Sequence, residues 1–418
     1  MSSPAHSFVY RLLRSSEKYF KTDMVYLAKG GFWLITSQVA ISLSSLGLSV
    51  AFANLLPPET YGTYRYILTI FNLLAIPTLT GINSALMRSA AQKMEGSLRT
   101  AFNTRLQWGL LSTLLGIGIT GYYLLQEDFV LAINIFLVSL FAPLFYSCEV
   151  YSYYLRGKKL FKHYSFYNSL AIIIPSLIVI GALFGSDNLT IILLSYFVPY
   201  TMLKGLFLFM TARQVEKSRP VDPELVSYGK HLSVMSILGV IAQNIDKFLL
   251  WHFLGAAQLA VYAFALSPVS NMEAVMGKLD LLIFPKVAEH NIGEIRKTIY
   301  EKALRIFLVA ASVVALYILC APFLYSIFFP QYLESVAYSQ VFALTLLISL
   351  PLMVFSAVFT AHAKIREKYY LSVIGPSIKI LLFILLIPQY GIWGLVFGTL
   401  GFHLVSAVAS IFFFRNMA

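Results

Sequence analysis

The feature that most constrains this chain is a series of apolar runs, each about 20 to 25 residues long, enough for a helix to cross a hydrocarbon core roughly 30 Å thick. The runs cover residues 29–54, 63–86, 106–126, 129–151, 165–185, 189–211, 231–254, 261–284, 304–328, 337–361, 369–388 and 392–414. Backbone groups in hydrocarbon must be paired within their own segment, so runs of this kind fold as α-helices. The sequence therefore predicts an all-α polytopic membrane protein with 12 transmembrane helices.

The composition excludes several other classes of protein. With 58% hydrophobic and 12% charged residues, the 418 residues carry too little polar surface to cover a soluble globule. The net charge of +12 is interpreted as a sign of membrane topology, and no nucleic-acid partner is expected, because no soluble segment is long enough to carry a basic patch. The first apolar run is too long for a secretory signal peptide, so we expect it to remain in the mature protein.

The cationic residues fix the predicted orientation. Of the 31 Lys and Arg residues, 27 lie in or beside the loops on one side, Arg88 and Arg105 among them, and the opposite loops contain none. Positive charge favours the cytoplasmic side of a membrane. The sequence therefore predicts a multi-pass protein of the cytoplasmic (inner) membrane with both termini in the cytoplasm.

The order of the runs predicts two halves. Residues 29–211 and 231–418 each contain six spans in the same orientation, and residues 212–230 form a cytoplasmic linker that contains Pro220 and Pro223. The turns at residues 56–64 and 254–262 both run from Leu to Tyr. Parallel repeats of this kind are typical of transporters that rock one lobe against the other around a central site. Residues 1–28 are either an amphipathic segment on the inner leaflet or a solvated tail.

Polar residues recur along one face of the spans in equivalent positions of the two halves. They are Gln38, Ser42, Ser45 and Ser49 in the first span; Arg65, Thr69, Asn72, Thr80 and Asn83 in the second; Ser233, Ser236, Gln243, Asp246 and Lys247 in the seventh; and Ser270, Glu273 and Asp280 in the eighth. Hydroxyl side chains commonly serve helix packing. Charged side chains within a span are costly and favour a cavity or a charged partner.

Four cations, Arg65, Lys204, Lys247 and Lys379, lie within spans. Arg65 and Lys204 are close enough to an interface to reach it, whereas Lys379 is near the middle of its span. Adjacent residues of a helix point about 100° apart, so we do not expect Asp246 and Lys247 to pair directly. Each is expected to meet a charge on another helix or a water-filled lumen.

Several kinds of chemistry have no sequence signal. The two cysteines, Cys148 and Cys320, both lie in predicted spans and indicate neither a disulfide framework nor a metal site. The histidines lack metal-ligand spacing, and no phosphate-binding glycine motif is present. We therefore expect no cofactor, no metal and no ATP hydrolysis by the chain itself.

Several segments resemble Wzx-type oligosaccharide flippases, which handle O-antigen and other polysaccharide units within the multidrug/oligosaccharidyl-lipid/polysaccharide exporter superfamily. The resemblance lies in residues 28–33 (AKGGFW), 55–64 (LLPPETYGTY), 81–88 (GINSALMR), 244–250 (NIDKFLL) and 387–394 (IPQYGIWG). It implies a V-shaped pair of six-helix lobes around a cavity and undecaprenyl-pyrophosphate-linked oligosaccharide as cargo. Family members that handle acidic sugars have a strongly cationic lumen, whereas this chain balances its intramembrane charges, so a preference for an acidic glycan is not implied.

The leading hypothesis is therefore a flippase for lipid-linked oligosaccharide, by alternating access. Arg65, Lys247, Lys379 and Arg88 are candidate partners of the pyrophosphate, because Arg offers a bidentate contact and Lys a point charge. Gln38, Asn72, Asn83 and Gln243 are candidates for the sugar hydroxyls. Asp246 and Glu273 are candidates for coupling transport to a proton or cation gradient, although a structural ion pair would give the same pattern.

Two alternatives remain open. A drug or metabolite antiporter of the same superfamily would have the same spans. A membrane-embedded glycosyltransferase or polymerase would usually have a long outer loop with catalytic carboxylates, and the outer loops here are short, so no enzymatic activity is expected. A polysaccharide polymerase and a chain-length regulator are possible protein partners of the flippase.

Overall fold

The computed structural model describes residues 24–216, 219–277, 292–361 and 365–416. Within these ranges the chain is helical, without β-strands. The first half contains α2 (Met24–Leu55), α3 (Pro58–Leu73), η1 (Ile76–Thr78), α4 (Gly81–Ala91), α5 (Ser97–Leu125), α6 (Phe129–Cys148), α7 (Val150–Gly157), α8 (Phe161–Gly185) and α9 (Leu189–Arg213). The second half contains α10 (Leu225–Met276), α12 (Ile292–Phe328), η3 (Pro330–Tyr332), α13 (Ser335–Ala343), α14 (Thr345–Ala361), α15 (Ile365–Tyr390) and α16 (Ile392–Arg415).

These helices confirm an all-α polytopic membrane fold. Ten of the described helices are long and apolar enough to cross a membrane, and α3 with α4, bent by 55° at their break, would make eleven. One of the ten, α10, is 52 residues long and is interrupted by Gly255 at φ 80°, so it covers most of the seventh and eighth predicted spans. The total of twelve and the division into two lobes stay predictions. The predicted segment at residues 1–28 lies almost entirely outside the described residues.

The surface of the bundle suits a lipid environment. Large apolar side chains are exposed along the outward faces of the helices, for example Leu114 at 63%, Leu319 at 79% and Val408 at 69%. Two helix starts are closed by local side chains: Asp128 accepts a hydrogen bond from the N–H of Leu131 at the start of α6, and Asn188 does the same for Thr190 at the start of α9. The apolar outer surface is what a helix bundle presents to lipid.

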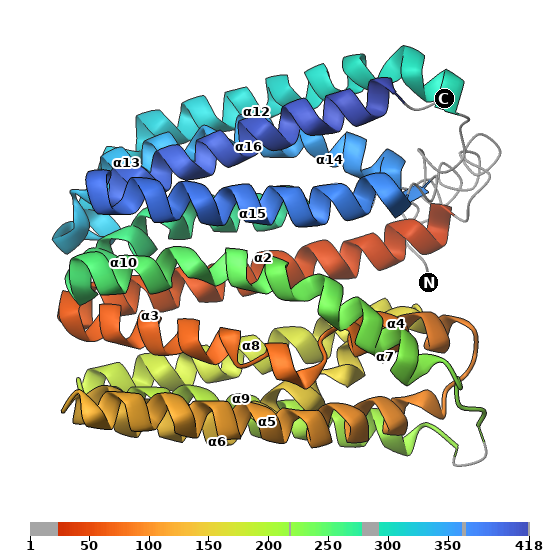
Figure 1. The fold of residues 1–418 in the computed structure, drawn as a ribbon, viewed down its shortest axis with the longest axis horizontal. Helices are drawn as coiled ribbons and strands as arrows, with labels where there is room; N and C mark the ends of the chain where they lie inside the picture. The colour runs from red at the N-terminus through yellow and green to blue at the C-terminus, as the bar shows by residue number, and fades with distance from the viewer. Residues whose placement is uncertain (1–23, 217–218, 278–291, 362–364, 417–418) are drawn as a thin grey trace, which may run out of the picture.

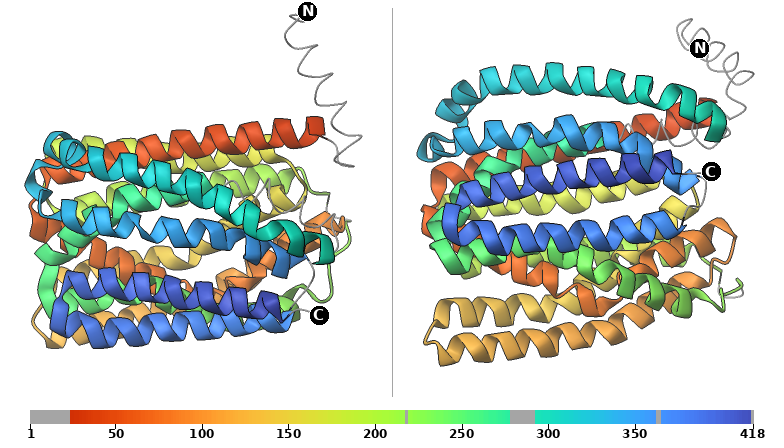
Figure 2. Two further views of the ribbon diagram at one scale, coloured as in Figure 1. Left: turned by 90° about the horizontal axis from the view of Figure 1, so that it is seen from above. Right: turned by 45° about the horizontal axis from the view of Figure 1, so that its top comes forward.

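The helices run roughly parallel to one another (Figure 1). In this view α12 to α16 lie above α10 and α3 to α9 lie mostly below it (Figure 1). Seen from above, α2 runs along one edge of the bundle (Figure 2, left), and it packs mainly against α8. The connection between α4 and α5 lies at one end of the bundle, and the turn between α5 and α6 lies at the opposite end (Figure 1). These two successive loops thus lie on opposite sides, as the predicted topology requires.

The bent second span packs closely on α10 at both ends of their contact, through α3 at one end and through α4 at the other. At one end, a Cβ added to Gly62 would lie 1.9 Å from the carbonyl oxygen of Ala256, so only glycine permits this approach. Tyr66 of α3 stacks on Trp251 of α10 with ring centroids 4.4 Å apart. At the other end, the N–H of Gly81 donates to the Ser233 hydroxyl at 2.9 Å. Residues 56–64 and 254–262, the two turns predicted to be equivalent, thus meet each other at Gly62 and Ala256.

Candidate functional site

A buried carboxylate on α10 lies at the centre of the candidate site. Asp246 is 4% exposed and accepts a hydrogen bond of 2.6 Å from the hydroxyl of Tyr262. The ammonium of Lys247 lies 3.1 Å from both carboxylate oxygens and also donates to the carbonyl oxygen of Gln243 at 3.2 Å. The expectation that these neighbours do not pair is wrong, because the long Lys247 side chain folds back across the angle between the two positions.

The polar residues of α3 reach the same stretch of α10. The amide nitrogen of Asn72 lies 3.4 Å from the amide oxygen of Asn244, which the sequence pattern did not single out. The side chains of Asn72 and Gln243 are both exposed in the structure.

A second ammonium, that of Lys379 on α15, faces this cluster. It interacts electrostatically with Asp246, Lys247 and Glu273. Its nearest aromatic neighbours are the rings of Phe383 at 5.4 Å and Phe402 at 5.8 Å, and it forms no hydrogen bond with the part of the chain that the structure describes. Its role as a partner of the pyrophosphate stays a prediction.

Arg65 lies among tyrosines on the same face of α3 as Asn72, two turns earlier in the helix. It interacts electrostatically with Tyr61, Tyr64, Tyr196 and Tyr262. Its Nε atom is buried without a hydrogen-bond partner among the described residues. Tyr262 is thus a neighbour of Arg65 and the donor to Asp246, which links the cation of α3 with the acid of α10.

The polar stripe of α2 serves mainly helix contacts. The amide of Gln38 donates to the hydroxyl of Ser42 at 3.4 Å, one turn further along α2. The hydroxyl of Ser49 lies 3.4 Å from that of Ser267 on α10, and Ser37 contacts Ser169 of α8 at 2.8 Å. These contacts agree with the packing role expected for the serines.

Asn83 and Arg105 stabilise a break in the second span. The chain leaves the helix between α3 and α4, where Leu79 adopts φ 56°. The guanidinium of Arg105 on α5 donates to the carbonyl oxygen and the hydroxyl of Thr78, each at 3.1 Å, and to the amide oxygen of Asn83 at 2.5 Å. Asn83 is therefore occupied inside the protein and does not join the cluster around Asp246.

The burial of Arg105 and Lys204 differs from what the sequence analysis expects. Arg105 is predicted beside an inner loop, but α5 begins eight positions earlier, at Ser97, and the side chain is fully buried. Lys204 is 6% exposed and does not reach an interface, because its ammonium lies 3.7 Å from the ring of Phe145 and 3.4 Å from the carbonyl oxygen of that residue. Arg105 falls one residue outside the predicted span that starts at residue 106, so the sequence assigns it to a loop. Lys204 has no charged neighbour in the sequence that would indicate a buried position.

Arg88 lies away from the cluster, against the predicted linker. Its guanidinium is 3.4 Å from the carboxylates of Asp222 and Glu224 and 4.3 Å from the ring centroid of Tyr228. Burial of Asp222 acts to raise its pKa, but hydrogen bonds from Ser89, from the backbone of Glu224 and from Arg88 outweigh it and lower the pKa below 3.8. The ionised Asp222 thus ties the linker to α4.

An apolar groove runs along the second part of α10. It has a volume of about 820 Å³ and is lined by α2, the part of α10 after Gly255, and α12. Its walls include Leu43, Leu46 and Val50 of α2, Met272 and Met276 of α10, and Val313 and Phe328 of α12. Glu273 of α10 lies between two of these wall residues in sequence, so the groove and the charged residues share a helix.

Comparison with known proteins defines the family. The sequence matches the polysaccharide biosynthesis protein family over residues 27–277. The chain belongs to this family. The match confirms the resemblance to oligosaccharide flippases and covers the helices that carry Arg65, Asp246 and Lys247. No curated protein sequence matches the chain.

Solved structures show the same fold. The lipid II flippase MurJ in its inward closed conformation superposes with a TM-score of 0.68 at 14% identity, covering 92% of this chain and 88% of that one. An inward-facing MATE family transporter of the MOP superfamily gives 0.63 at 17% identity, with coverages of 92% and 100%. A MOP superfamily transporter from Pyrococcus furiosus gives 0.59 at 17% identity, with coverages of 93% and 95%. At these identities the likeness shows the fold alone.

Proposed function

We propose that this protein flips undecaprenyl-pyrophosphate-linked oligosaccharide units from the inner to the outer leaflet of the cytoplasmic membrane for surface polysaccharide biosynthesis, such as that of lipopolysaccharide O-antigen. The family match supports a role in polysaccharide biosynthesis. The observation that carries the proposal is the position of two ammonium groups, Lys247 and Lys379, around Asp246 on membrane-spanning helices. Such charges are costly in a membrane and are retained for a function.

Each part of the cargo has a matching chemistry. A pyrophosphate carries negative charge that must be balanced when it leaves water, and Lys379, Lys247 and Arg65 offer that balance. Sugar hydroxyls match the exposed amides of Asn72 and Gln243. A polyprenyl chain matches the apolar groove between α2, α10 and α12, since burying its methylene groups releases water or replaces lipid contacts. Arg88 and Asn83 are already engaged inside the protein and are left out of this assignment.

The transport cycle in this proposal is alternating access coupled to a proton or cation gradient. Asp246 and Glu273 are the acids available for coupling: the first is bound by Tyr262 and Lys247, and the second lies within electrostatic reach of Lys379. Protonation of Asp246 would free Lys247 to bind a phosphate. A polysaccharide polymerase and a chain-length regulator are the expected protein partners on the outer side.

The test uses the purified protein in vesicles that contain a fluorescent polyprenyl-pyrophosphate oligosaccharide in the inner leaflet. Wild type should expose the sugar to an external glycosidase, and Lys247→Ala should reduce the initial rate at least about tenfold, whereas Lys247→Arg retains part of it. Arg99→Ala, which removes an exposed cation outside the cluster, is the matched control. Normal flipping by Lys247→Ala would remove this residue from the site. Export of small organic cations without lipid flipping would favour the antiporter alternative.

A further inference from the structure

A second, polar pocket lies far from the charged cluster, at the end of the bundle that is predicted to face outward. It has a volume of about 440 Å³ and lies where α3, α6 and α9 begin. Glu59, Thr60 and Thr63 come from α3, Phe129 and Asn134 from α6, and Asp187 and Thr190 from the start of α9. None of these residues belongs to the proposed pyrophosphate site.

The polar floor of the pocket is already ordered by hydrogen bonds within the protein. The Thr190 hydroxyl donates to the amide oxygen of Asn134 at 2.9 Å, and the amide nitrogen of Asn134 donates to the carbonyl oxygen of Val130 at 2.8 Å. Asn134 is 3% exposed, so this chain is fixed in place. Such a floor is preformed for a ligand, which reduces the ordering cost of binding.

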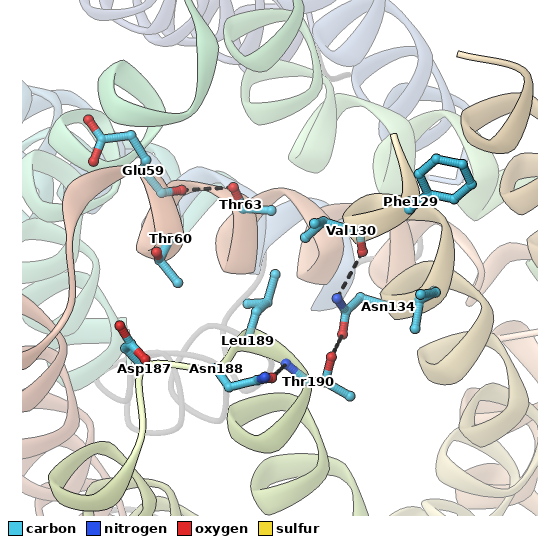
Figure 3. Close-up of a pocket in the computed structure, with 11 residues that line it drawn as sticks. Glu59, Thr60, Thr63, Phe129, Val130, Asn134, Asp187, Asn188, Leu189 and Thr190 are labelled. Atoms are coloured by element: carbon cyan, nitrogen blue, oxygen red, sulfur yellow. Dashed lines mark hydrogen bonds between the residues drawn. The ribbon is translucent and has the colours of Figure 1, made fainter. Parts of the chain in front are cut away.

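The two carboxylates of the pocket are free. Glu59 and Asp187 are exposed and form no side-chain hydrogen bond or ion pair with the part of the chain that the structure describes. Figure 3 shows them on one side of the pocket with Thr60 between them, and Phe129 on the opposite side. The predicted outer loops contain no Lys or Arg that could neutralise them. Both carboxylates therefore keep their full capacity to accept hydrogen bonds.

The charge of the pocket selects among ligand classes. Three helices begin here, and a helix N-terminus by itself favours an anion. However, Asn188 already caps the first N–H groups of α9 and Asp128 those of α6, and the two free carboxylates repel an anion. A hydroxyl-rich ligand instead gives donors to Glu59 and Asp187, and its apolar C–H face can lie on the ring of Phe129, which is 61% exposed.

We infer that this pocket is a binding subsite for a sugar residue without negative charge, on the outer face of the protein. The inference rests on the proposed function for the source of the sugar, which would be the glycan after translocation. Its recognition chemistry is independent of transport: carboxylates for hydroxyl groups, an aromatic ring for the C–H face, and no cation for an acidic sugar.

The test measures sugar binding by saturation-transfer NMR on the full-length protein in nanodiscs. The probes are the methyl glycosides of galactose, N-acetylglucosamine and glucuronic acid. Wild type should bind at least one neutral glycoside saturably and the glucuronide at least about tenfold more weakly, because the acidic sugar meets two carboxylates. Glu59→Gln with Asp187→Asn should weaken neutral-sugar binding about tenfold, and Phe129→Ala should weaken it without altering the preference for charge.

Matched controls separate this pocket from the central cluster. Glu127→Gln and Glu334→Gln change outer acids that do not line the pocket and should bind as wild type. Lys247→Ala should also retain sugar binding while losing flipping, so the failure of the proposed function and the failure of this inference give different results. The absence of saturable binding of any neutral glycoside, unchanged binding by both the double variant and Phe129→Ala, or a site that takes only Ca²⁺ through the two carboxylates would each overturn the inference.

Discussion

At the scale of single residues, Asp246 illustrates how a charge is retained inside a membrane span. Its carboxylate accepts a hydrogen bond from the Tyr262 hydroxyl and is paired with the Lys247 ammonium, and these two contacts offset the cost of removing it from water. The same contacts make it sensitive to protonation, because a neutral Asp246 would no longer hold Lys247. The geometry is the same whether Asp246 and Lys247 only stabilise the fold or couple transport to a gradient. Substitution distinguishes these two roles.

We expect Asp246→Asn to retain binding of lipid-linked oligosaccharide but to lose the dependence of flipping on the proton gradient. The amide can still accept from Tyr262 but cannot exchange a proton at physiological pH. The measurement is flipping in reconstituted vesicles with and without an imposed gradient. If the pair is only structural, the single variant should instead lose abundance, and Asp246→Asn with Lys247→Ala should restore it. Unchanged gradient dependence in a folded variant would leave Glu273 as the coupling candidate.

At the scale of elements, the second span is the least regular in the described structure. Its halves, α3 and α4, are bent by 55° around residues that leave the α-helix, and backbone groups released by such a break need partners in a membrane. Arg105 supplies them from α5, and Ser233 supplies a hydroxyl to Gly81 from α10. Pro77 within the break interrupts the helix locally, and the two neighbouring helices supply partners for the backbone groups that are released.

Arg105→Ala should destabilise the protein by at least about 3 kcal/mol, because it leaves the Thr78 carbonyl and the Asn83 amide without donors in a buried site. Arg105→Lys should recover only part of this stability, since one ammonium cannot replace a fork of donors. The measurement is thermal unfolding in nanodiscs. Arg99→Ala removes an exposed cation from the same helix and is the control. Equal stability of the two alanine variants would contradict a supporting role for Arg105.

The linker contact of α4 should depend on pH. The folded pKa of Asp222 is lowered, so the ionised form stabilises the fold above pH 3.8 and this contribution is lost as the pH falls through the lower folded value. We expect Asp222→Asn to cost about 1 to 3 kcal/mol at neutral pH. The difference from wild type should disappear in acid, whereas Glu224→Gln, which removes an exposed partner of Arg88, should change little. Thermal unfolding between neutral and acid pH checks both statements, and a destabilisation by Asp222→Asn that does not decrease in acid would contradict them.

At the scale of the whole molecule, hydropathy predicts the positions of several spans well, but it does not predict the contacts between their side chains. The predicted boundaries at 165–185, 189–211 and 392–414 differ from α8, α9 and α16 by at most four residues, because lipid-facing runs and capping residues are local signals. The break at Leu79, the depth of Arg105 and the pairing of Lys247 with Asp246 depend on contacts between helices. Sequence spacing identifies the cluster residues on α10, but the contribution of Tyr262 emerges only when the chain turns at Gly255.

The orientation of the whole molecule is the remaining prediction. Gln92 and Gln126 lie exposed just before and just after α5, at its two opposite ends. In a background with Cys320 replaced by serine, Gln126→Cys should react with an impermeant maleimide in intact cells. Gln92→Cys should react only after the membrane is permeabilised, because it lies beside the cation-rich loops. Cys148 is buried and should contribute little background. The opposite labelling pattern would reverse the membrane orientation, place the sugar pocket in the cytoplasm, and invert the proposed direction of transport.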